Sequence, residues 1–159
     1  MSNQKTEALD SSIAHDRATH LLKLASKAAA RALQDKLAER SVAYGHWTFM
    51  RILWKCDGIG ITDLSRRAHV AKPAAVSAVQ AMEKLGYVRR VRREGNQKNV
   101  YIHLTPSGWA LEKKLVPLAE EVNDLALAGL DEAERDAFRH ALLTVIRNID
   151  AARGDTGTS

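Results

Sequence analysis

The stretch that most constrains the fold runs from Ile61 to Thr105, because its hydrophobic period changes partway along. Residues 61–68 and 72–85 each carry apolar side chains at helical spacing, and a three-residue connection separates them. After Gly86 the apolar residues alternate instead, which is typical of half-buried strands. Two short helices joined by a tight turn predict a helix-turn-helix, and the strands that follow predict a wing attached to it.

The second of these helices, residues 72–85, carries clear local signals. Pro73 lies in its first turn, where the missing N–H of proline costs nothing. Ala75, Val79 and Met82 fall at i, i+4 and i+7, so we expect them to share one buried face. The glycine that follows is the residue expected where a helix stops in a left-handed turn.

The predicted wing consists of two extended runs joined by a turn. Residues 88–91 form the first run, and Val100, Ile102 and Leu104 alternate in the second. Between the runs, the segment REGNQK at 93–98 contains the glycine and asparagine that favour the tip of a hairpin.

Positive charge is concentrated in this same stretch. Between Arg66 and Lys98 the chain has nine lysines and arginines against two glutamates, a net charge of +7. The whole chain carries only +5, so the remaining residues together carry −2. A local excess on an element suited to groove binding indicates a nucleic-acid surface, although a purely solvated face is the alternative.

Several motifs, taken in their order and spacing, resemble the MarR family of winged helix-turn-helix transcriptional regulators. They are YGHWTFMRIL at 44–53, the pair Leu64–Ser65, EKLGYVRR at 83–90 and HLTPSG at 103–108. The resemblance extends over about residues 15–150. It implies a homodimeric regulator, most often a repressor, that responds to a small ligand.

Further helices are expected outside the helix-turn-helix, over residues 12–39, 44–56, 106–128 and from 131 to about 151. DGIG at 57–60 ends the second of them with two glycines. Thr105 caps the third, and the proline after it fills the first turn. Asp131 and Glu134 have capping-box spacing at the start of the last.

The predicted fold is mainly α with a small β-wing, in which a winged helix-turn-helix carries long N- and C-terminal dimerisation helices. The predicted regions are a flexible N-terminus at 1–11, a helical dimerisation region at 12–40 and 106–152, a DNA-binding region at 41–105 and a flexible tail at 153–159. The outer helices are more apolar than one small winged domain could cover, so we expect them to pack with a second copy. Such a dimer holds two recognition helices roughly 34 Å apart, which matches a pseudo-palindromic site.

The side chains expected to contact DNA lie on the two short helices and on the wing. They are Lys72, Pro73, Ala74, Val76, Ser77, Arg66, Arg92, Arg93, Gln97 and Lys98. Ala74 and Val76 could meet thymine methyl groups, or could simply pack within the protein. Ser77 could bond to a base edge, and Lys72 to a phosphate or a guanine.

The wing departs from the pattern of the family. An Asp-x-Arg sequence normally occupies its tip, and the arginine enters the minor groove; here Asn96-Gln97-Lys98 stands at those places. A lysine lacks the flat guanidinium that suits a narrow groove, so Arg92 or Arg93 is expected to contribute more. Arg90 is either another contact of this kind or a structural partner within the wing.

The family resemblance also implies a ligand, often an aromatic acid, bound where the dimer helices meet the winged region. The candidate residues on the first two helices are His20, His46, Trp47, Met50 and Arg51, with Trp109 a weaker candidate. A carboxylate needs a cation or paired donors, and a ring needs an apolar wall. Trp47 fits the core better than a ligand site, and Arg51 is equally a candidate for a solvated surface.

Other chemistries find little support. Cys56, the single cysteine, lies at a helix C-terminus, which disfavours a reactive thiolate, so we expect an inert thiol. The six histidines contain no i, i+3 or i, i+4 pair, and no catalytic motif appears. We therefore expect no enzyme activity, no metal and no cofactor.

No apolar run approaches the roughly 20 residues that span a bilayer, and no signal-peptide segment begins the chain. We therefore expect a cytoplasmic protein without a membrane partner. The principal hypothesis is a sequence-specific regulator, expected to be a repressor, that binds double-stranded DNA and is released by a small, aromatic-acid ligand. The alternatives are an architectural protein that coats or bends DNA without sensing a ligand, and a helical interaction protein, which the +7 segment disfavours.

Overall fold

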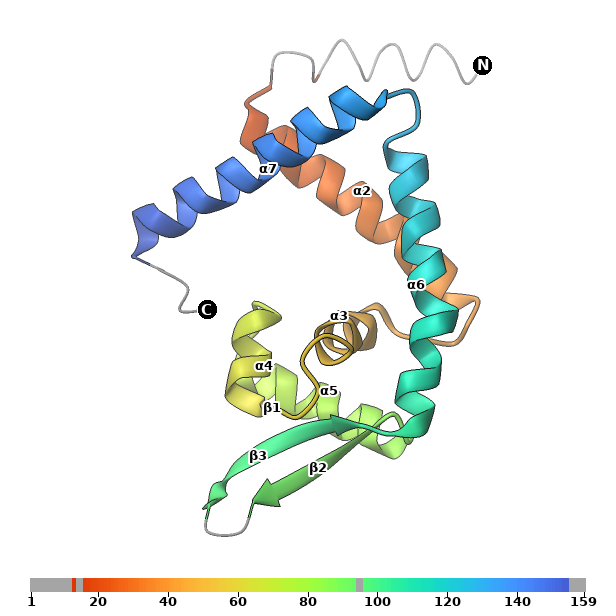
Figure 1. Ribbon diagram of the computed structural model, residues 1–159, viewed down its shortest axis with the longest axis vertical. Helices are drawn as coiled ribbons and strands as arrows, with labels where there is room; N and C mark the ends of the chain where they lie inside the picture. The colour runs from red at the N-terminus through yellow and green to blue at the C-terminus, as the bar shows by residue number, and fades with distance from the viewer. Residues whose placement is uncertain (1–12, 14–15, 94–95, 155–159) are drawn as a thin grey trace. The chain divides into compact units, whose positions relative to one another are not determined.

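The structure is a computed structural model that describes residues 13, 16–93 and 96–154, with the backbone alone for residues 93 and 96–98. The predicted flexible N-terminus and most of the predicted flexible tail lie outside these residues. The chain divides into two compact units, residues 1–122 and 123–159. In chain order the elements are α2 (Ala18–Ala38), α3 (Tyr44–Leu53), β1 (Ile59–Gly60), α4 (Ile61–Arg67), α5 (Lys72–Lys84), β2 (Val88–Arg93), β3 (Asn96–Leu104), α6 (Pro106–Ala126) and α7 (Glu132–Arg153) (Figure 1).

The predicted helix-turn-helix is confirmed within one residue at each helix end. Helices α4 and α5 are joined by a turn in which His69 has a φ of 54°, and the N–H of Val70 donates to the carbonyl of Ser65. Ala75, Val79 and Met82 are the buried residues of α5, as their spacing predicts. Gly86 has a φ of 77°, so the helix ends in the left-handed turn that a glycine permits.

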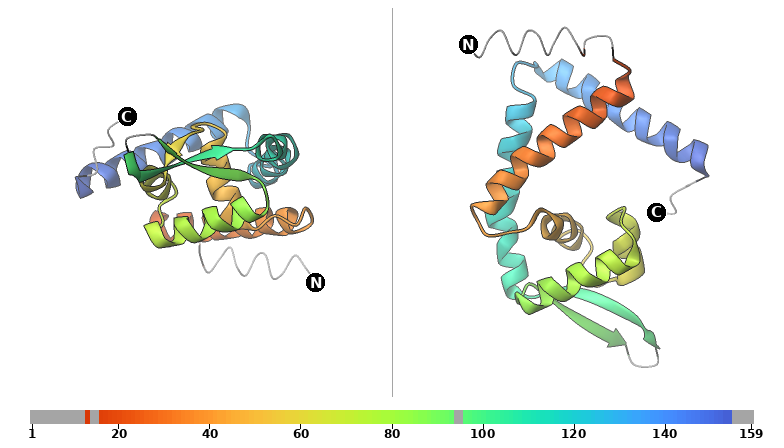
Figure 2. Two further views of the ribbon diagram at one scale, coloured as in Figure 1. Left: turned by 90° about the horizontal axis from the view of Figure 1, so that it is seen from below. Right: turned by 180° about the vertical axis from the view of Figure 1, so that it is seen from behind.

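The wing belongs to a three-stranded antiparallel sheet with the order β1-β3-β2. Strand β2 pairs with β3 from Val88 opposite Leu104, and the hairpin extends away from α5 (Figure 2). The turn predicted at 93–98 extends too far toward the C-terminus, because β3 already begins at Asn96. Residues 94–95 lie outside the described part of the chain.

The third strand, β1, was not expected from the sequence. The segment DGIG at 57–60 was predicted only to end a helix, but Ile59 pairs with Ile102 and Gly60 with Tyr101. The preceding helix also ends at Leu53, three residues earlier than predicted. A two-residue strand is too short to show an alternating pattern, so only its pairing with β3 reveals it.

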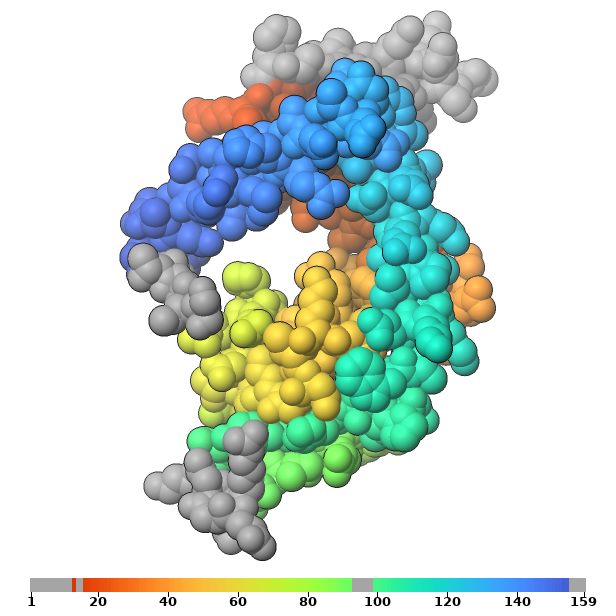
Figure 3. All heavy atoms as spheres, viewed as in Figure 1, coloured from red at the N-terminus to blue at the C-terminus, as the bar shows by residue number. Residues whose placement is uncertain are grey.

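The core of the first unit lies between the C-terminal half of α2, α3, the helix-turn-helix, the sheet and α6. Helix α3 buries Trp47, Phe49, Met50 and Leu53, and the rings of Trp47 and Trp54 meet edge to face at 5.7 Å. The indole N–H of Trp54 donates to the carbonyl of Gly108 at 3.1 Å, which fixes the end of α3 against α6. In the space-filling view, side chains close the space between α3, α4 and the sheet (Figure 3).

Thr105 and Gly108 of the HLTPSG motif each have a structural role at the start of α6. The Thr105 hydroxyl accepts the backbone N–H of Gly108 at 3.1 Å, which is the predicted cap. The same hydroxyl donates to the carbonyl of Gly86 at 2.5 Å. A Cβ at Gly108 would overlap the carbonyl oxygen of Tyr87, so only glycine allows this close approach.

Helix α2 begins at Ala18, whereas the sequence predicted a start at residue 12. Residues 12, 14 and 15 lie outside the residues that the structure describes. Its C-terminal half enters the core through Leu33 and Leu37. Lys36 pairs with Glu121 of α6 at 2.6 Å, and the hydrogen bond to this carboxylate raises the pKa of Lys36. Leu21 and Leu24, in its N-terminal half, are exposed.

In the second unit α7 begins with the predicted capping box. The Asp131 carboxylate accepts the N–H of Glu134, and the Glu134 carboxylate accepts the N–H of Asp131, both at 2.9 Å. Gly129 has a φ of 88° in the turn before it. Not one residue of α7 is buried, although its sequence includes Phe138, Ile146 and Ile149. Among the described residues, no helix combines the length and apolar character that crossing a membrane requires.

Candidate nucleic-acid interface

The exposed face of α5 is a continuous stripe. Pro73, Ser77, Gln80 and Lys84 are exposed and follow each other at i, i+4, i+7 and i+11, so they lie along one side of the helix. The three buried residues of α5 lie on the opposite side. We call these four residues the α5 stripe. A helix that exposes one whole side beside a hairpin has the form required to enter a groove of DNA.

The predicted contacts on α5 lie at and around the start of this stripe. Lys72, Pro73, Ala74 and Ser77 are exposed, whereas Val76 is half-buried at its edge. The contacts expected from the sequence end at Ser77, after the first turn and a half of the helix, and do not include Gln80 and Lys84. The signal was available, because both continue the helical period that begins at Pro73 and Ser77.

The wing carries the second group of cations. Arg89 and Arg92 are exposed on β2. Arg90 is engaged by Glu83 of α5: its Nε donates to the carboxylate at 2.8 Å, its terminal nitrogen lies 2.7 Å away, and its backbone N–H donates at 3.1 Å. The structure therefore gives Arg90 a partner within the protein. The side chains of the predicted contacts Arg93, Gln97 and Lys98 lie outside the described part of the chain.

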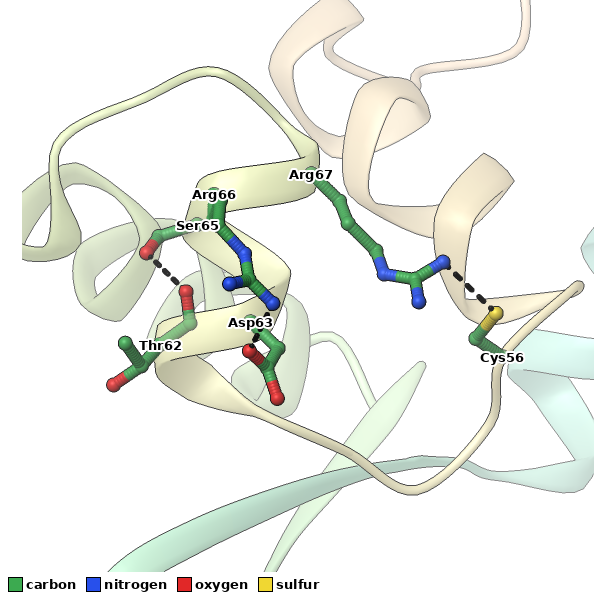
Figure 4. Close-up of polar contacts among 6 residues, drawn as sticks. All are labelled: Cys56, Thr62, Asp63, Ser65, Arg66 and Arg67. Carbon is green, nitrogen blue, oxygen red and sulfur yellow. Dashed lines mark hydrogen bonds and ion pairs between the residues drawn. The ribbon is translucent and has the colours of Figure 1, made fainter. Parts of the chain in front are cut away.

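Helix α4 presents two arginines in different directions (Figure 4). Arg66, a predicted contact, pairs with Asp63 at 2.7 Å while most of its side chain remains exposed. An exposed pair of this kind stabilises by only about 0–1 kcal/mol, so a phosphate could displace the carboxylate. Ser65, the residue before Arg66, is buried, and its hydroxyl donates to the carbonyl of Thr62 at 2.8 Å.

Arg67 points to the other side of α4 and donates to the sulfur of Cys56 at 3.4 Å (Figure 4). In the sequence, the cation next to this thiol is Lys55. Arg67 is eleven residues away in the chain, and only the packing of α4 against the end of α3 brings the two side chains together. Cys56 is half-buried.

The predicted ligand residues are distributed over two helices. Trp47 and Met50 are buried in the core, Arg51 is exposed, and His46 is half-buried, which lowers its pKa. On α3 the i, i+4 spacing places His46 beside Met50 and Trp47 beside Arg51.

The remaining candidates lie elsewhere. His20 is exposed near the start of α2 and lies 3.8 Å from Asp16. It is roughly 20 Å along the helix from Leu33, where α2 joins the core, so it is not next to the α3 candidates in one chain. Trp109 is exposed on α6. Among the described residues, no group of three histidine, cysteine or acidic side chains could hold a metal ion.

A helix-turn-helix whose second helix exposes one side next to a basic hairpin defines the class of winged helix-turn-helix proteins. Comparison with known proteins points to one family within that class. A model of the MarR family matches residues 44–100, from the start of α3 into β3, and so spans the helix-turn-helix. Members of the family are regulators and not enzymes.

The chain is similar to characterised and solved members of the family. It is 29% identical over 107 residues to the homoprotocatechuate degradative operon repressor of Escherichia coli, across 67% of this chain and 72% of that protein. Its fold resembles that of a MarR-family regulator of Listeria monocytogenes solved in complex with 26mer DNA, with a TM-score of 0.78, 23% identity, and coverage of 91% of this chain and 97% of that one.

A second solved structure is BpsR of Bordetella bronchiseptica, studied for the regulation of its DNA binding by 6-hydroxynicotinic acid. It has a TM-score of 0.73 and 20% identity, and the match covers 80% of this chain and 96% of that one.

Proposed function

We propose that this chain is a sequence-specific repressor that binds a pseudo-palindromic operator as a homodimer and is released by a small aromatic acid. The observation that carries the proposal is the α5 stripe, exposed along the whole helix and flanked by the cations of α4 and β2. Such a helix lies in the major groove while cations beside it contact phosphates.

The proposed contacts divide by chemistry. Ser77 bonds to a base edge, and Ala74 with the half-buried Val76 contacts thymine methyl groups, with Pro73 beside them. Lys72, Arg66 and the wing cations Arg92, Arg93 and Lys98 contact phosphates or the minor groove, and Gln97 is a further proposed contact. Arg90 is left out of this group because Glu83 holds it.

The proposed regions are those expected from the sequence. Residues 41–105 bind DNA, and the helices within 12–40 and 106–152 join two copies in a cytoplasmic dimer. The exposed apolar residues of α7 support this division. A closed symmetric dimer buries such a face without exposing a new one.

Repression and an aromatic ligand are proposed by analogy with relatives. One is by name the repressor of a homoprotocatechuate operon, and the DNA binding of another is regulated by 6-hydroxynicotinic acid. Here His46 and Arg51 supply polar and cationic groups, while Trp47 and Met50 form an apolar wall behind them. His20 would join such a site from α2 of the partner copy.

The test begins with selection of binding sites from a randomised duplex library, followed by fluorescence anisotropy on the enriched sequence. We expect an inverted repeat, and an affinity that falls by about 10³–10⁵-fold between 50 and 200 mM salt. Ser77→Ala should relax base preference, and Lys72→Ala should weaken binding to all sequences equally. Equal affinity for every duplex would instead indicate an architectural protein.

The ligand is tested separately by thermal shift with a panel of aromatic carboxylic acids and their uncharged amides. A bound acid at 100 times its dissociation constant adds about 2.7 kcal/mol to the free energy of unfolding. The same acid should release the operator, and Arg51→Met should abolish both effects. An acid that stabilises the protein without releasing DNA would contradict the proposed regulation.

A further inference from the structure

We infer that Gln80 reads an adenine in the major groove and is the main determinant of base specificity on α5. This inference rests on the proposed function, since it assumes that α5 enters the groove. It adds the chemistry of one base pair: an adenine that presents its N7 acceptor and its N6 donor to the carboxamide of Gln80.

The direction of the Gln80 side chain follows from helix geometry. With about 100° per residue, Ser77 and Lys84 lie within about 15° of the direction opposite the buried face, and Gln80 lies within about 50°. The half-buried Val76 is turned away from this direction by about 90°, and Lys72 by more than about 120°. Gln80 therefore projects outward more directly than most of the residues first expected to contact bases.

Gln80 also differs from its neighbours in what it can recognise. A carboxamide has both a donor and an acceptor, and it pairs with adenine through two hydrogen bonds. Within the α5 stripe Ser77 offers a single hydroxyl, Lys84 offers only donors and Pro73 offers neither. Gln80 alone in the stripe matches the paired pattern of a base edge. Its carboxamide has no hydrogen-bond partner among the described residues, so it is available to DNA.

The surroundings of Gln80 favour the approach of DNA. The one acidic residue of α5, Glu83, would repel phosphates if its charge were free. Its carboxylate is neutralised by Arg90 through two side-chain contacts of 2.7 and 2.8 Å. Lys84, the next residue, is exposed and can contact a phosphate beside the base that Gln80 reads. The end of α5 thus offers Lys84 to a phosphate and Gln80 to a base edge.

The inference is tested by repeating the library selection with Gln80→Ala and Gln80→Arg. We expect the unmodified protein to enrich adenine at one position in each half-site. Gln80→Ala should lose about tenfold of the discrimination at that position and keep its preferences elsewhere. Gln80→Arg should shift the preference at the same position to guanine, whose N7 and O6 accept a bidentate guanidinium.

Gln34→Ala, at an exposed glutamine on α2, is the matched control and should select the unmodified site. Replacing the selected adenine with 7-deazaadenine removes the N7 acceptor. This should weaken binding of the unmodified protein and leave the affinity of Gln80→Ala unchanged. Because Gln80 is exposed and alanine favours helices, Gln80→Ala is expected to fold, which circular dichroism checks.

The two proposals fail in different ways. If the unmodified protein shows no preference for any sequence, the proposed function itself is wrong. If it selects a site, and Gln80→Ala selects that same site with the same discrimination at every position, the function stands and the role of Gln80 is overturned.

Discussion

Glu83 near the end of α5 holds Arg90 on β2 through three contacts: two from the guanidinium at 2.7 and 2.8 Å, and one from the backbone N–H at 3.1 Å. The hydrogen bond from the Arg90 side chain, above all, lowers the pKa of Glu83. Because one carboxylate binds both the side chain and the backbone of the strand, it sets the direction in which the hairpin leaves the helix. The pair is therefore a link between α5 and the wing.

The first prediction separates Arg90 from the neighbouring arginine on the same side of β2. Arg92 is exposed and has no partner among the described residues, whereas Arg90 is held by Glu83. Arg92→Met should lower the slope of log affinity against log salt by about 0.9 per lost phosphate contact. Arg90→Met should leave the slope unchanged and lower the free energy of unfolding by about 0.5–1 kcal/mol. Anisotropy titrations at several salt concentrations and urea unfolding measure the two effects.

If Arg90→Met lowers the slope as much as Arg92→Met does, Arg90 contacts DNA despite its partner. Glu83→Gln provides an independent check, because it keeps the shape of the side chain, removes the charge and replaces one of the two accepting oxygens with a donor. It should lower the free energy of unfolding by a similar amount at neutral pH. The lowered pKa of Glu83 means that this contribution is present above the unfolded pKa of 4.5 and is lost as the pH falls below it.

Local signals in the sequence were sufficient for much of this fold. The glycine at 86, the threonine–proline start of α6 and the capping box of α7 each act within a few residues, so a single chain segment determines the outcome. The helix-turn-helix and the mainly α fold with a small wing were predicted on this basis, and both are confirmed.

Long-range relationships could not be predicted in the same way. Strand β1 forms because Ile59 pairs with Ile102. Two residues are too few to show the alternating pattern that predicts a strand. Arg67 meets Cys56 only after two helices have packed together. The helical period alone could have extended the exposed face of α5 to Gln80. Only the structure shows that the Gln80 side chain has no hydrogen-bond partner among the described residues.

The second prediction concerns the close approach at the start of α6. In Gly108→Ala the new methyl group would meet the backbone carbonyl of Tyr87, which cannot move without disturbing β2. The free energy of unfolding should fall by about 3 kcal/mol, at the upper end for overpacking. Gly45→Ala is the control: it lies in α3 with no atom within 4 Å of the added carbon, and should stabilise by up to about 1 kcal/mol. Urea unfolding of both variants compares them, and equal stabilities would contradict a clash with the Tyr87 carbonyl.

The third prediction is a pH dependence of stability that arises at His46. Burial lowers the pKa of His46 below its ordinary value of 6.5. Below pH 6.5 the unfolded state therefore binds more protons at this residue than the folded state does, and the free energy of unfolding decreases as the pH falls. Above the unfolded pKa the contribution is complete. His46→Gln should flatten the slope between about pH 7 and pH 5, whereas His140→Gln, at an exposed site of α7, should keep it.

The fourth prediction follows from the unburied apolar side of α7. Phe138, Ile146 and Ile149 are 43%, 55% and 53% exposed, and they lie on one side of the helix by their spacing. Leaving such a face in water is costly, and a second copy that covers it recovers about 25 cal/mol for each Å² of apolar surface. Ile146→Glu should therefore convert a dimer to monomers in sedimentation equilibrium.

The matched control is His140→Glu, which introduces the same charge on the opposite side of α7 and should leave the dimer intact. Operator binding provides a second readout of the same change. A monomer holds one recognition helix, so Ile146→Glu should bind a single half-site as weakly as the unmodified protein does and lose the added affinity of the inverted repeat. If Ile146→Glu remains a dimer with full affinity for the inverted repeat, the apolar side of α7 is not the surface that joins two copies.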